Sequence, residues 1–200
     1  EGFLVKPVSP DELIAAVVIR AERMRTLRSL MARDSLCGLY NHSTTTQFLE
    51  QSLSLASRRD ADLCFVMIDI DHFKSINDTY GHPVGDQVIV ALARILQQRV
   101  RHADIVGRYG GEEFALILND TIAERAFQLL NELRQTFSRL IFNTPQGDFS
   151  ATFSAGIADR KSHPTATSIR EAADRALYAA KRNGRNRVIL DKDPTWMQTI

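Results

Sequence analysis

The sequence has little of several residue types, and each scarcity excludes a class of protein. Its 200 residues include only two cysteines, one tryptophan, six prolines and ten glycines. Two cysteines make neither a disulfide framework nor a C-x-x-C site here, which favours a reducing, cytoplasmic compartment. The low glycine and proline counts exclude collagen-like and low-complexity chains. No apolar run reaches the ~18–20 residues that a membrane-spanning helix needs.

The net charge of the chain is also small. The 25 Lys and Arg residues almost cancel the 24 Asp and Glu residues, which leaves a formal charge of +1. A chain with so weak an overall field is not suited to holding a long nucleic acid, so any phosphate binding must come from local clusters. The hydrophobic fraction of 44% is ordinary for a globular chain and sufficient for one sizeable core.

The N-terminal part indicates a fragment of a longer protein. Residues 1–9 have the pattern of a strand stopped by Pro7, and residues 10–33 that of one long helix that begins behind a cap at Ser9. Apolar residues recur there at steps of three and four, which is typical of a pairing stalk and also of an ordinary packed helix. We expect a folded domain over 34–190 and a mobile tail over 191–200.

Helical and strand patterns alternate along the domain. We expect helices over 44–57, 84–100, 122–137 and 169–183, and strands over 63–71, 105–109, 114–118, 149–158 and 187–190. This order predicts an α/β fold (α+β, with a mixed sheet), in which about five strands form a central sheet flanked by helices.

Two carboxylates end an otherwise apolar strand. Alternate side chains of a strand share a face, so Asp69 and Asp71 lie on the side of Phe65 and Met67. Such carboxylates are costly unless they are solvated, paired or bound to a metal. The pattern alone is also typical of acids that face water or cap the next helix, so a metal site is one of several interpretations.

Two further clusters could serve a nucleotide. The run Gly110–Phe114 combines a double glycine, which permits a tight turn with positive φ, with Glu112 and Glu113. Near the C-terminus, Lys181 and Arg185 stand one turn apart around a helix end, with Gly184 between them. Each cluster has a plainer interpretation, a solvated hairpin tip and a solvated basic helix face respectively.

Four blocks in order carry a resemblance to a known family. Gly110-Gly-Glu-Glu-Phe114 resembles the GGDEF signature of diguanylate cyclases in its GGEEF form. Residues 34–41, DSLCGLYN, are similar to the opening DxLTGLxN of the family, with Cys37 in place of threonine. Residues 69–86 and 178–186 resemble its second and closing blocks. The resemblance implies a fold like the palm domain of polymerases and class III nucleotide cyclases, preceded by a helical stalk.

The resemblance also implies roles for individual residues. Asp69, the Ile70 carbonyl, Glu112 and Glu113 would hold Mg²⁺ or Mn²⁺, with Glu112 activating a ribose 3′-hydroxyl. The substrate GTP would be bound by residues that read guanine, hold the triphosphate or leave room for it: Lys74, Asn77, His82, Asp86, Gly110, Gly111, Lys181 and Arg185. The implied reaction joins two GTP into cyclic di-GMP with release of two pyrophosphates, and it needs a homodimer because each protomer holds one GTP.

The resemblance implies regulation at two places in the chain. Arg101 and Asp104 resemble an inhibitory RxxD site for the product, and Arg134 is a candidate for a second arginine at that site. Residues 2–7 resemble the end of a receiver domain, which implies a two-component response regulator with that domain in the same full-length chain. The alternatives are a catalytically silent GGDEF module that binds GTP or cyclic di-GMP, and a different nucleotide cyclase or palm.

Overall fold

The computed structural model describes residues 10, 14, 17–20 and 32–191. Contacts divide the chain into two units, Glu1–Arg33 and Asp34–Ile200. In the first unit, residues 17–20 are helical and Val17 is 58% exposed. The expected receiver end over 1–9, most of the expected stalk and the tail after residue 191 lie outside the described residues.

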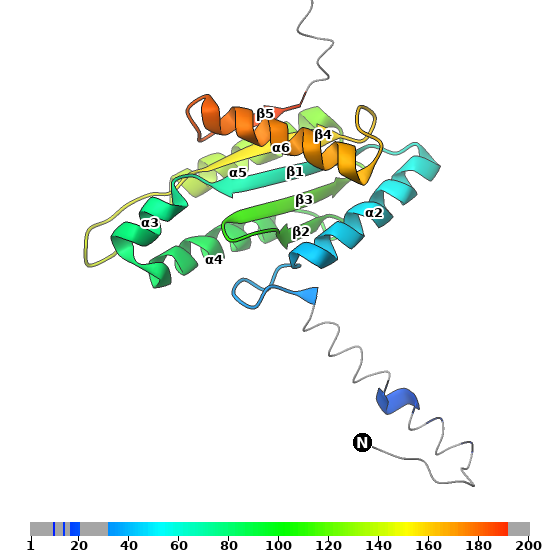
Figure 1. The fold of residues 1–200 in the computed structure, drawn as a ribbon, viewed down its shortest axis with the longest axis horizontal. Coiled ribbons are helices and arrows are strands. Elements are labelled where there is room, and N and C mark those ends of the chain that lie inside the picture. Colours follow the sequence, from blue (N-terminus) through cyan, green and yellow to red (C-terminus); the bar gives the residue numbers. More distant parts are fainter. Residues whose placement is uncertain (1–9, 11–13, 15–16, 21–31, 192–200) are drawn as a thin grey trace, which may run out of the picture. The chain divides into compact units, whose positions relative to one another are not determined.

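The second unit alternates helices and strands as the sequence patterns predict (Figure 1). Its elements are α2 His42–Arg59, β1 Leu63–Ile70, α3 Phe73–Tyr80, α4 His82–Arg99, β2 Ile105–Arg108, β3 Glu113–Asn119, α5 Ala123–Ser138, β4 Phe153–Asp159, α6 Ala166–Arg182 and β5 Val188–Leu190. Asn41 begins α2 by accepting a hydrogen bond from the Thr44 backbone N–H, and Thr165 begins α6 with a capping box.

The strands form one five-stranded sheet in the order β2-β3-β1-β4-β5. β1 pairs antiparallel with both β3 and β4, whereas β4 and β5 are parallel. The predicted fold class, a mixed sheet flanked by helices, is confirmed. Because β1 lies at the centre, its carboxyl end is surrounded by neighbouring strands and the loops that follow them.

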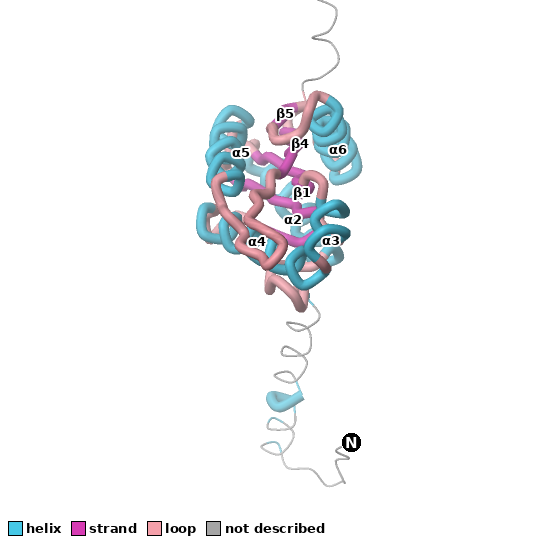
Figure 2. The backbone as a smooth tube through the Cα atoms, turned by 90° about the vertical axis from the view of Figure 1, so that its left-hand side faces the viewer, coloured by secondary structure: helices cyan, strands magenta, loops and turns pink. Residues whose placement is uncertain are grey.

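Helices cover both faces of the sheet, as the view in Figure 2 shows with α5 and α6 on opposite sides. Val66 and Ile68 of β1 pack with α4 and α5, whereas Phe65 and Met67 pack with α2 and α6. This alternation is the predicted one, and both apolar clusters are closed to solvent. Asp69 continues the row of Phe65 and Met67, so it lies on the α6 side.

Two elements differ from the sequence expectation. α3 was not predicted, because it is only 8 residues long and begins after His72 at φ +57° without a side-chain cap. β4 begins at Phe153 rather than at Phe149, which instead forms an isolated bridge with Phe142. The ring of Phe149 stacks on Tyr80 at 4.3 Å between centroids, so this outer segment supports the end of α3.

A close approach fixes α6 against β4. A Cβ atom added at Gly156 would collide with the Ala173 carbonyl and the Leu177 backbone nitrogen of α6. Only glycine allows this spacing. The consequence for function is that α6 delivers Lys181, in its last turn, to the carboxyl end of β1.

Candidate active site

Acidic and basic groups meet where β1 ends. Asp69 is directly paired with Glu113 of the antiparallel neighbour β3. Lys181 Nζ lies 2.7 Å from Asp69 Oδ2, and Asp69 is only 7% exposed. The three residues come from β1, β3 and α6, which are far apart in the sequence and are brought together by the sheet.

The electrostatics of Asp69 suit a cation. Burial raises the pKa of Asp69, and the hydrogen bond and charge of Lys181 oppose this without cancelling it. Glu112 and Glu113 add negative charge, which raises the pKa further. A buried carboxylate beside two other carboxylates gains from added positive charge, so this end of β1 favours metal ions or the ammonium of Lys181.

The turn between β2 and β3 is held against β1. The backbone N–H of Ile70 donates to the Glu112 carbonyl at 3.3 Å, and Tyr109 N–H donates to the Glu113 carbonyl at 2.7 Å. The turn therefore carries both acids to the end of β1. Neither Gly110 nor Gly111 uses the positive φ that a glycine permits. A Cβ at Gly110 would meet Glu113 Oε2 at 2.5 Å, so a larger residue there would displace the end of the Glu113 side chain.

Asp71 does not join this cluster. Its carboxylate accepts hydrogen bonds from Thr152 Oγ1 at 2.7 Å, Ser154 Oγ at 2.7 Å and the Asn186 backbone N–H at 3.0 Å. It is 4% exposed, and these donors occupy it fully. The idea that Asp69 and Asp71 form a metal pair on a shared face is therefore wrong: the chain leaves β1 after Ile70, and Asp71 ties β4 to the closing block.

The oxygen atoms at this end of β1 can supply some of the ligands that Mg²⁺ or Mn²⁺ needs. Hard oxygen ligands are present in Asp69, the Ile70 carbonyl, Glu112 and Glu113. Among residues 32–191, no three acidic or histidine side chains converge into a finished metal cage. Mg²⁺ characteristically takes one or two carboxylates and completes its shell with water and substrate phosphates. The residues present therefore fit a metal that arrives with a nucleotide.

A hollow of about 340 Å³ lies beside α4 and is lined by Leu36, Asp86, Gln87, Val90, Ala91 and Arg94. Asn77 of α3 lies against Gly85, the residue before Asp86, since a Cβ added at Gly85 would collide with Asn77 Oδ1. That oxygen is buried and has no hydrogen-bond partner. A buried acceptor without a partner is costly, so it points to a ligand that donates a hydrogen bond there.

The basic candidates surround the same end of the sheet from two sides. Lys74 is exposed on α3, and His82 is exposed at the first position of α4. Arg185 follows α6 with φ +60°, in a left-handed turn that also includes Asn186 at φ +45°. The Asn186 N–H contact with Asp71 holds this turn, so Arg185 is placed by the sheet rather than by a free tail.

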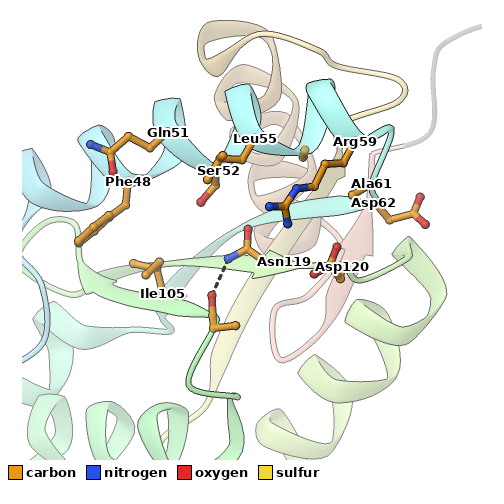
Figure 3. Close-up of a pocket in the computed structure, with 12 residues that line it drawn as sticks. Phe48, Gln51, Ser52, Leu55, Arg59, Ala61, Asp62, Ile105, Asn119 and Asp120 are labelled. Atoms are coloured by element: carbon orange, nitrogen blue, oxygen red, sulfur yellow. Dashed lines mark hydrogen bonds between the residues drawn. The ribbon is translucent and has the colours of Figure 1, made fainter.

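The RxxD segment forms a separate turn. The Asp104 carboxylate accepts from the Arg101 and Asn119 backbone N–H groups, both at 3.0 Å, while the Arg101 side chain is exposed. A hollow of about 290 Å³ adjoins this turn between α2 and β3. Figure 3 shows Arg59 reaching toward Asn119, whose side chain donates to the Ala103 carbonyl at 2.6 Å.

Arg134 of α5 contacts the closing block. Its guanidinium donates to Asn186 Oδ1 at 2.8 Å and to Asn131 Oδ1 at 3.3 Å. On the same helix, Glu132 pairs at 2.6 Å with Arg99, which stands two residues before Arg101. Residues two apart on a helix point about 200° apart, so Glu132 and Arg134 face different neighbours. A role for Arg134 at an inhibitory site stays a prediction.

Sequence reasoning missed two residues near the site. Leu36 lines the hollow beside Asp86, although it was assigned no role. Arg108 contacts both the opening block and the turn of the hairpin, through Asp34 and Gly111. Only its position two residues before the double glycine could have suggested it, and that spacing carries no chemistry by itself.

Comparisons with known proteins identify the family of the chain. The family described as "Diguanylate cyclase, GGDEF domain" matches residues 31–187. Probable diguanylate cyclase DgcC of Escherichia coli K12 is 42% identical over 171 residues, which cover 84% of this chain and 45% of DgcC. Response regulator PleD of Caulobacter vibrioides is 35% identical over 200 residues, covering 94% of this chain and 44% of PleD.

A solved structure shares the fold. The crystal structure of the coiled coil and GGDEF domain of DgcB from Caulobacter crescentus, in complex with c-di-GMP, has a TM-score of 0.84 at 33% identity. The match covers 90% of this chain and 96% of that one. This chain belongs to the diguanylate cyclase GGDEF-domain family, and it spans less than half the length of DgcC and PleD. Of the helices in its described part, none is long and apolar enough to cross a membrane.

Proposed function

We propose that this chain is the catalytic part of a diguanylate cyclase, which joins two GTP into cyclic di-GMP and releases two pyrophosphates. The observation that carries the proposal is the meeting of Asp69, Glu113 and Lys181 at the end of β1. In each step a ribose 3′-oxygen attacks the α-phosphorus of the other GTP. A new P–O bond forms, the bond to the β-phosphate oxygen breaks, and the hydroxyl proton passes to a base, for which Glu112 is the candidate.

Charge complementarity supports the phosphate roles. A bound divalent metal would supply Lewis-acid stabilisation of the phosphate under attack. Asp69, the Ile70 carbonyl, Glu112 and Glu113 are the groups that would hold it. Lys181 and Arg185 would offset the negative charge of the triphosphate, with Lys74 approaching from α3. Gly110 and Gly111 would leave the backbone of the turn open to the nucleotide.

Guanine is the base that the hollow beside α4 suits. Asn77 Oδ1 is an unsatisfied buried acceptor, and Asp86 adds carboxylate acceptors at the rim, with His82 nearby. Guanine offers N1–H and N2–H₂ donors on one edge, whereas adenine presents a different pattern. A base that cannot donate would leave these acceptors unpaired, and such mismatches are strongly rejected.

The wider arrangement is proposed from the resemblance and the relatives. Each protomer holds one GTP, so two copies of the chain must face each other. The match to PleD spans 94% of this chain and so extends into the N-terminal unit, which supports a place for the chain in a receiver-linked response regulator. The RxxD turn supports product inhibition through Arg101 and Asp104. Arg134 stays the candidate for a second arginine at that site, and Glu132 pairs with Arg99 just before the turn.

Glu112→Ala tests the assignment of the hairpin. We expect synthesis of cyclic di-GMP to fall below the limit of detection, while the free energy of unfolding changes by under ~0.5 kcal/mol. Glu50→Ala, which removes an exposed acid from α2, is the matched control and should keep wild-type activity. Synthesis by Glu112→Ala within tenfold of the Glu50→Ala rate would overturn the assignment.

A further inference from the structure

The first residues of the catalytic unit form a closed loop fastened to β2; we call residues 34–40 the opening loop. The Asp34 N–H donates to the Leu39 carbonyl at 2.8 Å, which closes the loop. Tyr40 forms a parallel bridge with Gly107, and the Arg108 N–H donates to the Tyr40 carbonyl at 2.8 Å. The loop therefore moves with β2, the strand that leads into the hairpin turn.

The carboxylate of Asp34 organises this loop and pairs with Arg108. It accepts from the Leu36 N–H at 3.1 Å and the Cys37 N–H at 3.0 Å, and Arg108 Nη1 lies 3.1 Å from each of its oxygens. Burial alone would raise the pKa of Asp34, but the hydrogen bonds from Cys37 and the charge of Arg108 outweigh it and lower the pKa. Asp34 is therefore a permanent anion at neutral pH.

The same guanidinium also holds the hairpin turn. Arg108 Nε and Nη2 donate to the Gly111 carbonyl at 3.1 and 2.7 Å. One planar side chain thus binds a carboxylate with one edge and a carbonyl with another, a geometry that an ammonium group cannot reproduce. Its side chain is 16% exposed and that of Asp34 is 21% exposed, so their ion pair is partly buried, whereas the bonds to the Gly111 carbonyl lie at the surface.

The backbone is consequently held on both sides of Glu112. Arg108 binds the Gly111 carbonyl, and the Ile70 N–H of β1 binds the Glu112 carbonyl. The opening loop meanwhile places Leu36 against the hollow that Asp86 also lines. Through Asp34, Arg108 therefore links the loop that carries Leu36 to the backbone that carries the acid of the turn.

We infer that Arg108 is a positioning residue for catalysis, which sets the Gly111–Glu112 peptide relative to β1 and ties it to Asp34 in the opening loop. The inference rests on the proposed function, because it assumes that the turn acts on GTP. Arg108 itself need not touch the substrate. A displacement of the order of 1 Å at a reacting group can cost about a hundredfold in rate, so loss of this link should act on turnover.

Two conservative variants test the link. Arg108→Lys keeps the charge but cannot bridge both acceptors, and Asp34→Asn keeps an acceptor for the loop N–H groups while it loses the charge that pairs with Arg108. We expect kcat to fall about 10- to 100-fold in each, with the GTP KM changed by less than about threefold. The double variant should be no slower than the slower single variant, because both break one link.

Arg160→Lys is the matched control. Arg160 also bridges a carbonyl and a carboxylate, with Nε 2.8 Å from the Ala61 oxygen and Nη2 2.9 Å from Asp60 Oδ1. It lies at the opposite end of β1, where its backbone N–H donates to the Leu63 carbonyl. The substitution removes the same kind of bridge far from the hairpin, so kcat and KM should both stay at wild-type values.

The measurement is initial velocity against GTP concentration, at a protein concentration where specific activity no longer rises, with melting temperatures recorded in parallel. If Arg108→Lys melts lower than Arg160→Lys, the isosteric Asp34→Asn variant decides. A kcat within threefold of the control, or a loss confined to KM, overturns the positioning role. If wild type and Arg160→Lys also make no cyclic di-GMP, the proposed function fails instead, which is a distinguishable result.

Discussion

The ammonium of Lys181 lies 2.7 Å from Oδ2 of Asp69, which joins the last turn of α6 to the end of the central strand. The Asp69 side chain is 10% exposed and that of Lys181 is 32% exposed, so solvent and a ligand can reach the pair from the lysine side. A metal that enters with a nucleotide would compete for the same carboxylate. If the Lys181 ammonium then moved from Asp69 to a phosphate of the substrate, substrate binding and metal binding would be coupled.

Lys181→Met should weaken substrate binding. A charge-assisted contact to a phosphate contributes about 1.5–3 kcal/mol, so we expect the GTP KM to rise roughly 10- to 150-fold. Lys161→Met is the control: Lys161 pairs with Asp62 at 2.8 Å, but it is exposed and follows β4 at the far end of the sheet. Steady-state kinetics of both variants decide the matter, and equal KM values would remove Lys181 from the substrate site.

Product inhibition should depend on Arg101. Arg101→Ala removes a side chain that can stack on and hydrogen-bond guanine, so the affinity for cyclic di-GMP should fall on the order of 30–150-fold. Initial rates without product should change little. Glu132→Gln, which removes the negative charge that pairs with Arg99 two residues before Arg101, should tighten product binding. Calorimetric titration of cyclic di-GMP into wild type and the two variants measures both the expected loss and the expected gain of affinity. Identical affinities would mean that the RxxD turn has a structural role only.

Asp71 should matter for stability. Asp71→Ala leaves the Thr152 and Ser154 hydroxyls and the Asn186 N–H without their acceptor, which should lower the free energy of unfolding by about 2–3 kcal/mol. Asp62→Ala removes only an exposed pairing and should lose clearly less. Denaturant unfolding gives both numbers. A change in Asp71→Ala no larger than in the control would contradict the anchoring role.

The thiol of Cys37 should react slowly and in a pH-dependent way. Burial, with the carboxylate of Asp34 beside it, raises the pKa of this thiol from 9.0 to about 11. Burial of the neutral thiol therefore stabilises the fold below pH 9, and this contribution disappears as the pH rises toward 11. Alkylation at pH 7.5, followed by peptide mass spectrometry, should be about a hundredfold slower than for a free thiol. Asp34→Asn should speed it, whereas an unchanged rate would contradict the contact.

Much of the fold was accessible from sequence because it rests on periodicity. The row of Phe65, Met67 and Asp69 follows directly from strand alternation, and the position of Lys181 follows from an amphipathic helix. α3 was missed because eight residues without a capping side chain give neither a period nor a start signal. The helix that carries Asn77 therefore could not be predicted from the sequence.

Individual contacts were less accessible, because they depend on where elements cross. Arg134 and Glu132 are two residues apart, and only the packing of α5 shows that Glu132 contacts Arg99 whereas Arg134 contacts Asn186. Asp69 and Asp71 have the same spacing, yet the end of β1 at Ile70 sends them to different partners. No short sequence pattern specifies which partner each of these residues contacts.

The most direct test of the central claim measures products and stoichiometry together. The protein is incubated with GTP and Mg²⁺ over a dilution series, and cyclic di-GMP and pyrophosphate are quantified after chromatographic separation. We predict two pyrophosphates for each cyclic di-GMP, no product from ATP, and a specific activity that rises with protein concentration to a plateau, since dimers are the active species. Binding of GTP without its consumption would contradict the account and identify a silent GGDEF module.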